Sequence, residues 1–117
     1  MRLMLFRHAK SGRPSGVADH DRPLSRSGRR ASKQMGKYLA NGRLVPDQAI
    51  ASTASRTQET WYLAKLGFKG DIVCRSENRA YDASADTLLE VIRETPNEVR
   101  NLIVVGHNRG FGNWRCD

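Results

Sequence analysis

Four side chains suited to phosphate chemistry each lie just after a short apolar segment of the chain. They are Arg7, His8, Arg56 and His107. An arginine presents a planar, permanently charged fork of N–H donors that matches phosphate oxygens. A histidine is a competent nucleophile near neutral pH, because much of it is uncharged there. The set favours phosphoryl transfer through a phosphohistidine over metal binding, since no carboxylate or thiolate is obviously placed beside the histidines.

The elements that must position these side chains alternate along the chain. Apolar runs and helical periodicity predict strands at 2–6, 48–52, 71–75 and 101–106, and helices at 25–41, 56–66 and 84–95. Such alternation indicates an α/β fold, with a mostly parallel central sheet flanked by helices in three layers. Because ligands bind outside the carboxyl ends of parallel strands, the four side chains are expected on one rim.

Helix ends and faces are also predicted. Ser25 and Ser84 are expected as N-caps, and Asn41-Gly42 and Pro96 as stops. In the second helix, Trp61, Ala64 and Leu66 are expected to point partly inward, and Gly67 is expected as the C-cap. In the third helix, Leu88, Val91 and Ile92 are expected to form one apolar face. The unbroken apolar run 101–106 is typical of a central parallel strand.

Length and charge limit the class of protein. The 117 residues form one domain, 1–117, and the formal charge of +8 favours negatively charged partners. Nucleic acid is disfavoured, because no basic tract carries interleaved aromatic residues. No apolar run could cross a bilayer and no secretory signal is evident, so a cytoplasmic protein is expected, with no membrane contact. Cys74 and Cys116 show neither a disulfide framework nor zinc spacing and are expected to be reduced thiols.

Several stretches together resemble one known family. "FRHAK" (6–10) resembles the arginine-histidine signature of the histidine phosphatase superfamily, which has a phosphoglycerate-mutase-like fold, with Ala9 where many members have glycine. "HDRPLSRSGRRAS" (20–32), "ASTASRTQET" (51–60), "YDASADTLL" (81–89) and "VGHN" (105–108) resemble its small bacterial branch, the SixA-type phosphohistidine phosphatases. The resemblance covers about residues 2–110.

The resemblance implies a role for each matching position. His8 is the expected nucleophile, Arg7 and Arg56 are expected to bind phosphate oxygens, and His107 is expected to complete the phosphate cage. Asn108 either donates to the pocket or orients His107, with a simple turn role as the alternative. No metal or organic cofactor is expected.

Further residues near these motifs stay open. Lys10 and Ser11 are candidate phosphate ligands, with a solvated loop cation as the alternative for Lys10. Asp19, His20 and Asp21 can be interpreted as a metal cluster or, preferably, as a structural loop in which Arg22 pairs with a nearby carboxylate.

A proton donor for the leaving group is harder to place. Glu77 and Asp82 are the candidates, and the alternative for each is a solvated loop carboxylate. A phosphohistidine substrate depends less on such an acid, because its imidazole leaving group can be protonated before it departs. Because the sequence shows no clear proton donor, it favours phosphoramidate substrates over phosphate esters.

The end of the sequence departs from the family pattern. After "VGHN" the chain continues "RGFGNWRCD" (109–117), with Arg109 in place of the usual proline and no apolar helical face. The family fold is therefore expected to be incomplete at its C-terminal end. An apolar patch left uncovered near Val104 is expected to promote a homodimer or domain swapping.

The sequence is compatible with three functions. The first is a phosphatase acting on a phosphohistidine-bearing protein, which the basic surface would attract if that protein is acidic. The second is a phosphomonoesterase for a small metabolite or nucleotide, with Glu77 or Asp82 as the acid. The third is a phosphate-binding module that has lost turnover.

Overall fold

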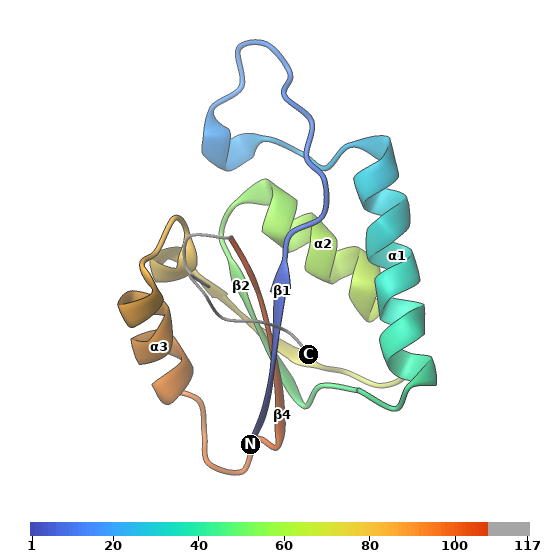
Figure 1. Cartoon of the computed structure of the whole chain (residues 1–117), viewed down its shortest axis with the longest axis vertical. Helices are drawn as coiled ribbons and strands as arrows, with labels where there is room; N and C mark the ends of the chain where they lie inside the picture. The colour runs from blue at the N-terminus through green and yellow to red at the C-terminus, as the bar shows by residue number, and fades with distance from the viewer. Residues whose placement is uncertain (108–117) are drawn as a thin grey trace.

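Four parallel strands form the middle layer of the structure, in the order β1-β4-β2-β3 (Figure 1). The strands are β1 (Arg2–Arg7), β2 (Gln48–Ser52), β3 (Val73–Glu77) and β4 (Asn101–Gly106). This computed structural model describes residues 1–107 of the chain. Within β4, Leu102, Ile103, Val104 and Val105 are fully buried, which confirms the prediction of a central strand.

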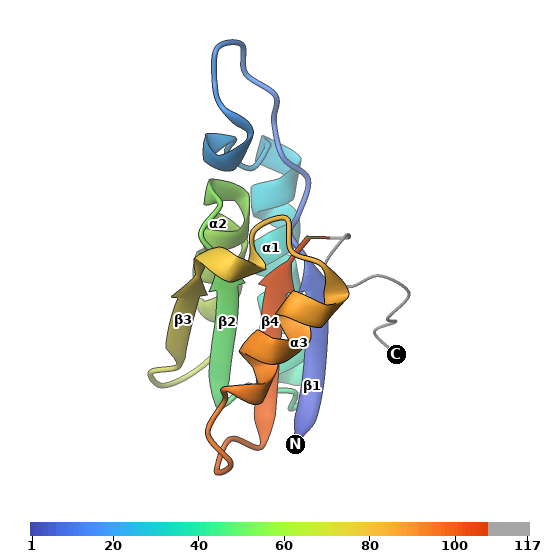
Figure 2. The ribbon, with the colours of Figure 1, turned by 90° about the vertical axis from the view of Figure 1, so that its left-hand side faces the viewer.

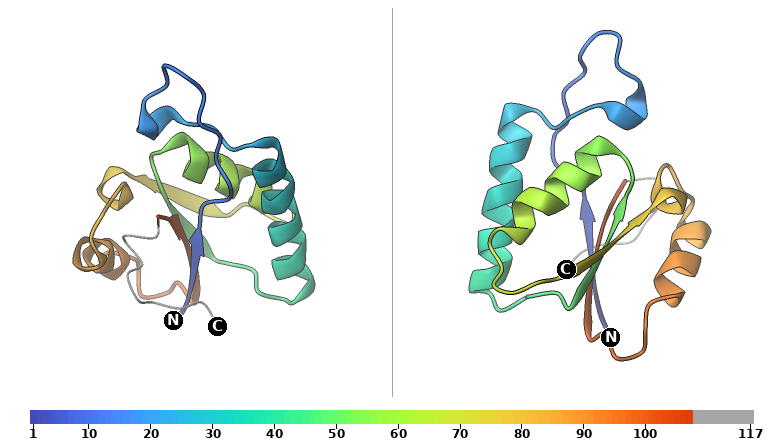
Figure 3. Two further views of the ribbon diagram at one scale, coloured as in Figure 1. Left: turned by 45° about the horizontal axis from the view of Figure 1, so that its top comes forward. Right: turned by 180° about the vertical axis from the view of Figure 1, so that it is seen from behind.

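Helices cover both faces of this sheet, as the three-layer prediction requires. Helices α1 (Arg26–Asn41) and α2 (Ser55–Lys65) lie on one face and α3 (Ala85–Arg93) lies on the other (Figure 2). Two short 3₁₀ helices, η1 (Asp19–Asp21) and η2 (Asn78–Ala80), were not predicted. The long connection from β1 to α1 projects beyond the carboxyl ends of the strands (Figure 3).

Alternate side chains of each strand feed two separate apolar clusters. Leu5, Ile50 and Val104 pack on the α3 side with Leu88 and Val91. Their chain neighbours Met4, Ala51 and Val105 pack on the opposite side, with Trp61 and Leu39 from α2 and α1. The period of two along β1, β2 and β4 thus fixes which face each helix covers.

The predicted caps of α1 and α3 are confirmed. The Ser25 hydroxyl accepts a hydrogen bond from the Gly28 N–H at 3.1 Å, and the Ser84 hydroxyl accepts one from the Thr87 N–H at 3.3 Å. Gly42 ends α1 as its C-cap. Each hydroxyl satisfies an N–H that has no partner within the helix.

Two predictions about the second helix and third strand were wrong. Leu66 is the C-cap of α2 and is 61% exposed, because the buried side of this helix ends at Ala64. The third strand occupies Val73–Glu77 rather than 71–75, because its register is set by pairing with β2, from Gln48↔Val73 to Ser52↔Glu77. Half-exposed edge strands carry a weaker apolar pattern than central ones, so their ends are harder to locate from sequence.

Only some of the predictions for the C-terminal end concern residues that the structure describes. Asn108, Arg109 and Cys116 lie outside the described residues. Val104 is buried, whereas Leu3 on the neighbouring edge strand β1 is 37% exposed. The homodimer stays a prediction. In the described part of the chain, no helix has the length and apolar character needed to span a membrane.

Close packing of α1 on α2 makes the first testable prediction. A Cβ added at Gly36 would lie inside van der Waals contact with the Ala64 carbonyl, so Gly36→Ala must push the helices apart. We expect the free energy of unfolding in denaturant to fall by about 1–3 kcal/mol, as for other overpacked sites. Gly42→Ala is the matched control, since its nearest new contact would be 3.5 Å away. Equal stability of the two variants would contradict the packing argument.

Candidate active site

The two predicted histidines meet at the carboxyl edge of the sheet. Strands β1 and β4 are adjacent and parallel, with Arg7 opposite Gly106, so His8 and His107 leave the sheet side by side. Their ring centroids are 5.3 Å apart. The backbone N–H of His8 also donates to the Gly106 carbonyl at 3.0 Å, which extends the ladder to the site itself. The sheet register therefore determines how far apart the imidazoles lie.

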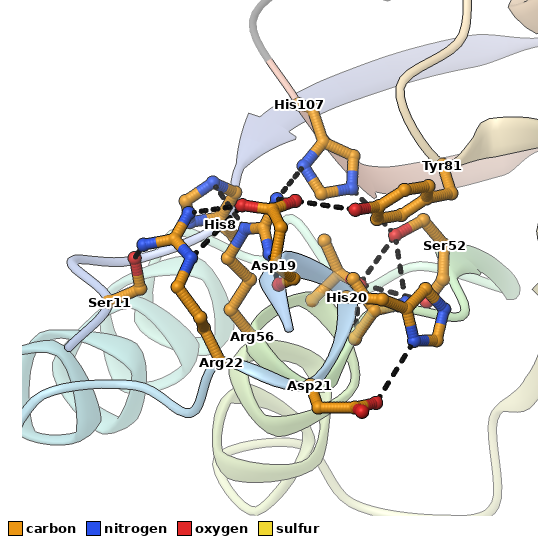
Figure 4. A network of polar contacts seen from close by, with 12 residues as sticks. His8, Ser11, Asp19, His20, Asp21, Arg22, Ser52, Arg56, Tyr81 and His107 are labelled. Atoms are coloured by element: carbon orange, nitrogen blue, oxygen red, sulfur yellow. Dashed lines mark hydrogen bonds and ion pairs between the residues drawn. The ribbon is translucent and has the colours of Figure 1, made fainter. Parts of the chain in front are cut away.

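Arg56 comes from the first turn of α2 and lies between these rings (Figure 4). Its Nε is 3.3 Å from His8 Nε2, and its Nη2 is 3.4 Å from His107 Nδ1. Arg56 is only 6% exposed. Three of the four predicted side chains are thus brought together around one buried positive charge.

Hydrogen bonds define the protonation state of His8. Its Nδ1 is 2.7 Å from the Ala9 carbonyl oxygen, which can only accept, so Nδ1 carries the proton. The Nε2 lone pair then faces the Arg56 Nε–H. Burial lowers the pKa of His8 below its ordinary value, and the nearby charges of Arg56, Arg7 and Arg22 act in the same direction. At neutral pH the ring is uncharged, with Nε2 as its nucleophilic atom.

His107 has the opposite tautomer. Its Nδ1 accepts from Arg56, so its Nε2–H donates to the Ser52 Oγ at 2.8 Å. The Ser52 hydroxyl in turn donates to Thr57 Oγ1 at 2.6 Å, and the Thr57 hydroxyl lies 2.8 Å from the Ser52 and Ala54 carbonyls. Burial, followed by the Arg56 charge, lowers the pKa of His107 to about 4. A buried hydroxyl chain thus holds His107 neutral and in a fixed orientation.

Asp19 in η1 covers the outer side of Arg56 (Figure 4). Its backbone carbonyl accepts from Arg56 Nη1 at 2.6 Å, and its carboxylate accepts from Arg56 Nη2 at 3.1 Å. The same carboxylate accepts from the Tyr81 hydroxyl and pairs with Arg22 at 2.8 Å. The hydrogen bond from Tyr81, and then those from the two arginines, hold the pKa of Asp19 well below its usual range. An ionised carboxylate therefore already occupies part of the Arg56 donor set.

Arg7 differs from Arg56 in being exposed. Its guanidinium makes no hydrogen bond or ion pair with another described residue, so its donors are available to an anion. Together with His8 and Lys10 it lines a hollow of about 330 Å³, completed by Ala9, Ser11 and Arg13. The hollow places the free arginine next to the nucleophilic ring.

The loop residues noted in the sequence have mainly structural contacts. The Ser11 hydroxyl accepts from Arg22 Nη1 at 3.0 Å, and Arg22 pairs with Asp19, as the preferred loop interpretation expects. His20 is bonded to Thr53 at 2.8 Å and to Asp21 at 3.3 Å. Among residues 1–107, no three side chains of metal-binding type are grouped to hold an ion.

The candidate proton donors are placed differently from each other. Glu77 pairs with Arg79 at 2.8 Å, and this bond lowers the pKa of Glu77, so the carboxyl stays ionised and poorly suited to donate a proton. Asp82 has a left-handed backbone, with φ of 50°, and its charge acts on His107. The role of either carboxyl group stays a prediction.

Four residues of this network escaped the sequence analysis as site residues. Asp19 was assigned to a metal cluster or, preferably, to a structural loop, and Tyr81, Ser52 and Thr57 were not singled out. The signal was present for three of them: Ser52 and Thr57 lie within the stretch 51–60, and Tyr81 begins the stretch 81–89. The spacing of these motifs is thus the spacing of the polar groups that support His107 and Asp19.

Comparison with known proteins places this geometry in a family. The model of the histidine phosphatase superfamily (branch 1) matches residues 3–82. An uncharacterised protein of Mycobacterium tuberculosis is 41% identical over 102 residues, covering 87% of this chain and 62% of its own length. The chain thus spans less than two thirds of that relative.

Solved structures agree with this match. A SixA protein of Agrobacterium tumefaciens, to which phosphohistidine phosphatase activity is ascribed, is 32% identical with a TM-score of 0.86, covering 93% of this chain and 70% of that one. A similarly described SixA protein of Nakamurella multipartitia is 33% identical with a TM-score of 0.80, and the match covers 90% of this chain and 58% of that one. The chain belongs to the histidine phosphatase superfamily, and its fold is that of its SixA-like neighbours.

The hydroxyl chain behind His107 gives the second prediction. We expect ¹⁵N NMR of the wild-type protein to show His107 neutral at pH 7, with its proton on Nε2, and to show protonation only near the pKa of about 4. Ser52→Ala removes the acceptor of that proton, so the Nε2–H should lose its hydrogen bond and the ring its fixed orientation, while the Arg56 donor still holds the tautomer. Ser76→Ala is the control, because that strand hydroxyl contacts Gln58 instead. A charged His107 at pH 7 in the wild type would contradict the assignment.

Proposed function

We propose that the chain is a phosphatase that forms a phosphohistidine intermediate on His8, and that its substrate is a phosphohistidine-bearing protein. The main support is a single contact: the unprotonated Nε2 of His8 lies 3.3 Å from Arg56 Nε. A neutral imidazole held against a guanidinium can attack phosphorus while the guanidinium binds the phosphate oxygens. Catalysis of phosphoryl transfer resides mainly in such positioning and electrostatic stabilisation.

The reaction follows from the protonation states. His8 Nε2 attacks phosphorus, the P–N bond of the substrate breaks, and the substrate imidazole leaves with a proton that it already carries. Water then attacks the phosphorus, the bond to His8 Nε2 breaks, and the water proton passes to solvent or phosphate. Arg7 and Arg56 hold the oxygens throughout. His107 joins them once its Nδ1 bears a proton, which the dianion favours over the free-state pKa of about 4.

The state of the carboxyl groups favours a phosphoramidate over an ester. An alkoxide needs a proton donor, and Glu77 is held ionised by Arg79. Imidazole leaves without one. The alternative is a phosphomonoesterase for a small metabolite, in which Asp82 would be the remaining donor. A phosphate-binding module without turnover is the other alternative, and it is separated from both by the experiment below.

Substrate comparison tests this proposal. The wild-type protein is incubated with a phosphohistidine peptide and with an alkyl phosphate ester, and phosphate release is measured. We expect cleavage of the peptide, with the ester cleaved far more slowly. His8→Ala should lose at least about a thousandfold in kcat, as expected when a nucleophile is removed, while vanadate still binds.

The third histidine supplies a matched control. His20→Ala removes an imidazole that contacts Thr53 rather than Arg56, so most of the activity should remain. Comparable cleavage of both substrates would favour the phosphomonoesterase. Retained vanadate binding without turnover of either substrate would leave only the binding module.

A further inference from the structure

A line of four cations runs along the exposed side of α1. Arg26, Arg30, Lys33 and Lys37 are separated by steps of four, three and four residues, which places them on one helix face. All four are exposed, whereas Gly28, Ser32, Gly36 and Leu39 form the buried side of this helix. We call these four residues the α1 ridge.

The ridge belongs to a strong imbalance of charge. Residues 1–43 contain eleven Lys and Arg against two Asp, whereas residues 44–107 contain seven Lys and Arg against nine Asp and Glu. The net positive charge of the described chain therefore arises in β1, the connection after it and α1. The connection leads from the end of β1 directly to the start of α1 (Figure 1), so the excess of cations lies on three consecutive elements.

The charges of the ridge are not balanced by the fold. In the described part of the chain no acidic side chain pairs with the ridge, and α1 uses only Arg29 in an ion pair, with Glu59 at 3.2 Å. Like charges three or four residues apart destabilise a helix. The first turn of α1 holds no acidic residue and its last turn no basic one, which is unfavourable for the helix dipole. An external anion is the partner that such an arrangement fits.

The ridge is joined rigidly to the catalytic hollow. The backbone N–H and the hydroxyl of Ser25 both donate to the Lys10 carbonyl, at 2.9 and 3.0 Å. Gly28 packs against the same carbonyl so closely that no side chain fits there. Lys10 lines the hollow with Arg7 and His8. The ridge thus begins at the rim of the site and leads away from it along α1.

We propose that the α1 ridge docks an acidic face of the protein whose phosphohistidine enters the site. Eleven residues of helix separate its ends, which is roughly 16 Å at 1.5 Å per residue. That length exceeds a small phosphate ester and suits a macromolecular surface. The inference rests on the proposed function, which also favours protein over nucleic acid: the phosphoramidate bond occurs on proteins and is absent from the nucleic acid backbone.

Paired peptides and paired charge reversals test the docking. One 15-residue peptide carries a phosphohistidine among glutamates, and the other has glutamines in their place. The ridge variant is Arg26→Glu/Arg30→Glu/Lys33→Glu. The control, Lys69→Glu/Arg93→Glu/Arg100→Glu, changes the net charge equally at exposed positions outside α1. Circular dichroism verifies that both fold.

We expect the wild-type kcat/KM at low salt to be at least about tenfold higher for the acidic peptide, as electrostatic steering provides. The ridge variant should lose this preference and still cleave the neutral peptide at the wild-type rate. The control variant should keep most of the preference for the acidic peptide. About 0.5 M salt should abolish this preference in the wild type, because salt screens the charges. An equal loss of the preference for the acidic peptide in the ridge variant and in the control variant would overturn the proposal.

Binding of the unphosphorylated acidic peptide, measured by fluorescence anisotropy, tests the ridge without turnover. If no peptide is hydrolysed, the proposed function fails, and weaker binding by the ridge variant than by the control still supports docking. Unchanged binding by the ridge variant would overturn it. A DNA duplex that binds through the ridge more tightly than the acidic peptide would overturn the choice of a protein partner.

Discussion

The guanidinium of Arg56 lies between two imidazoles and beneath a carboxylate, and the rest of the site is arranged around it. Its N–H groups face His8 Nε2, His107 Nδ1 and Asp19. Because a guanidinium only donates, both ring nitrogens must carry lone pairs. One buried cation therefore sets both tautomers, adds to the lowering of both histidine pKa values that burial causes first, and requires an acidic partner. The parallel pairing of β1 with β4 makes this possible, since it brings the two rings to one edge.

The two arginines proposed to bind phosphate are in different states. Arg7 is exposed and its guanidinium makes no hydrogen bond or ion pair within residues 1–107, whereas Arg56 donates to Asp19, whose carboxylate is also bound by Arg22 and Tyr81. In the proposed reaction, a phosphate dianion must compete with Asp19 for the donors of Arg56. A weakly charged anion displaces the Asp19 carboxylate less readily than a phosphoryl group does, because the phosphoryl group carries several charged oxygens. The free state is thereby preorganised without leaving a buried charge unpaired.

Much of this arrangement is predictable from sequence for a simple reason. Once the apolar runs are assigned to parallel strands, the residues that follow them must share one edge of the sheet. This reasoning predicted that His8, Arg56 and His107 lie close together. Asp19 could not be placed in that way, because its contact with Arg56 spans 37 residues and depends on the path of an irregular loop. Leu66 and the ends of β3 were misplaced where the apolar pattern weakens at an exposed edge. The hydroxyl chain behind His107 depends on rotamers, which sequence periodicity does not encode.

The central claim is that His8, His107, Arg7 and Arg56 close around one tetrahedral anion. A crystal structure of the protein with vanadate tests it most directly. The account predicts vanadium bonded to His8 Nε2, with its oxygens contacting both arginines and His107, and with the Asp19 carboxylate displaced from Arg56. Vanadate bound elsewhere, or bonded to another residue while Asp19 still covers Arg56, would contradict it.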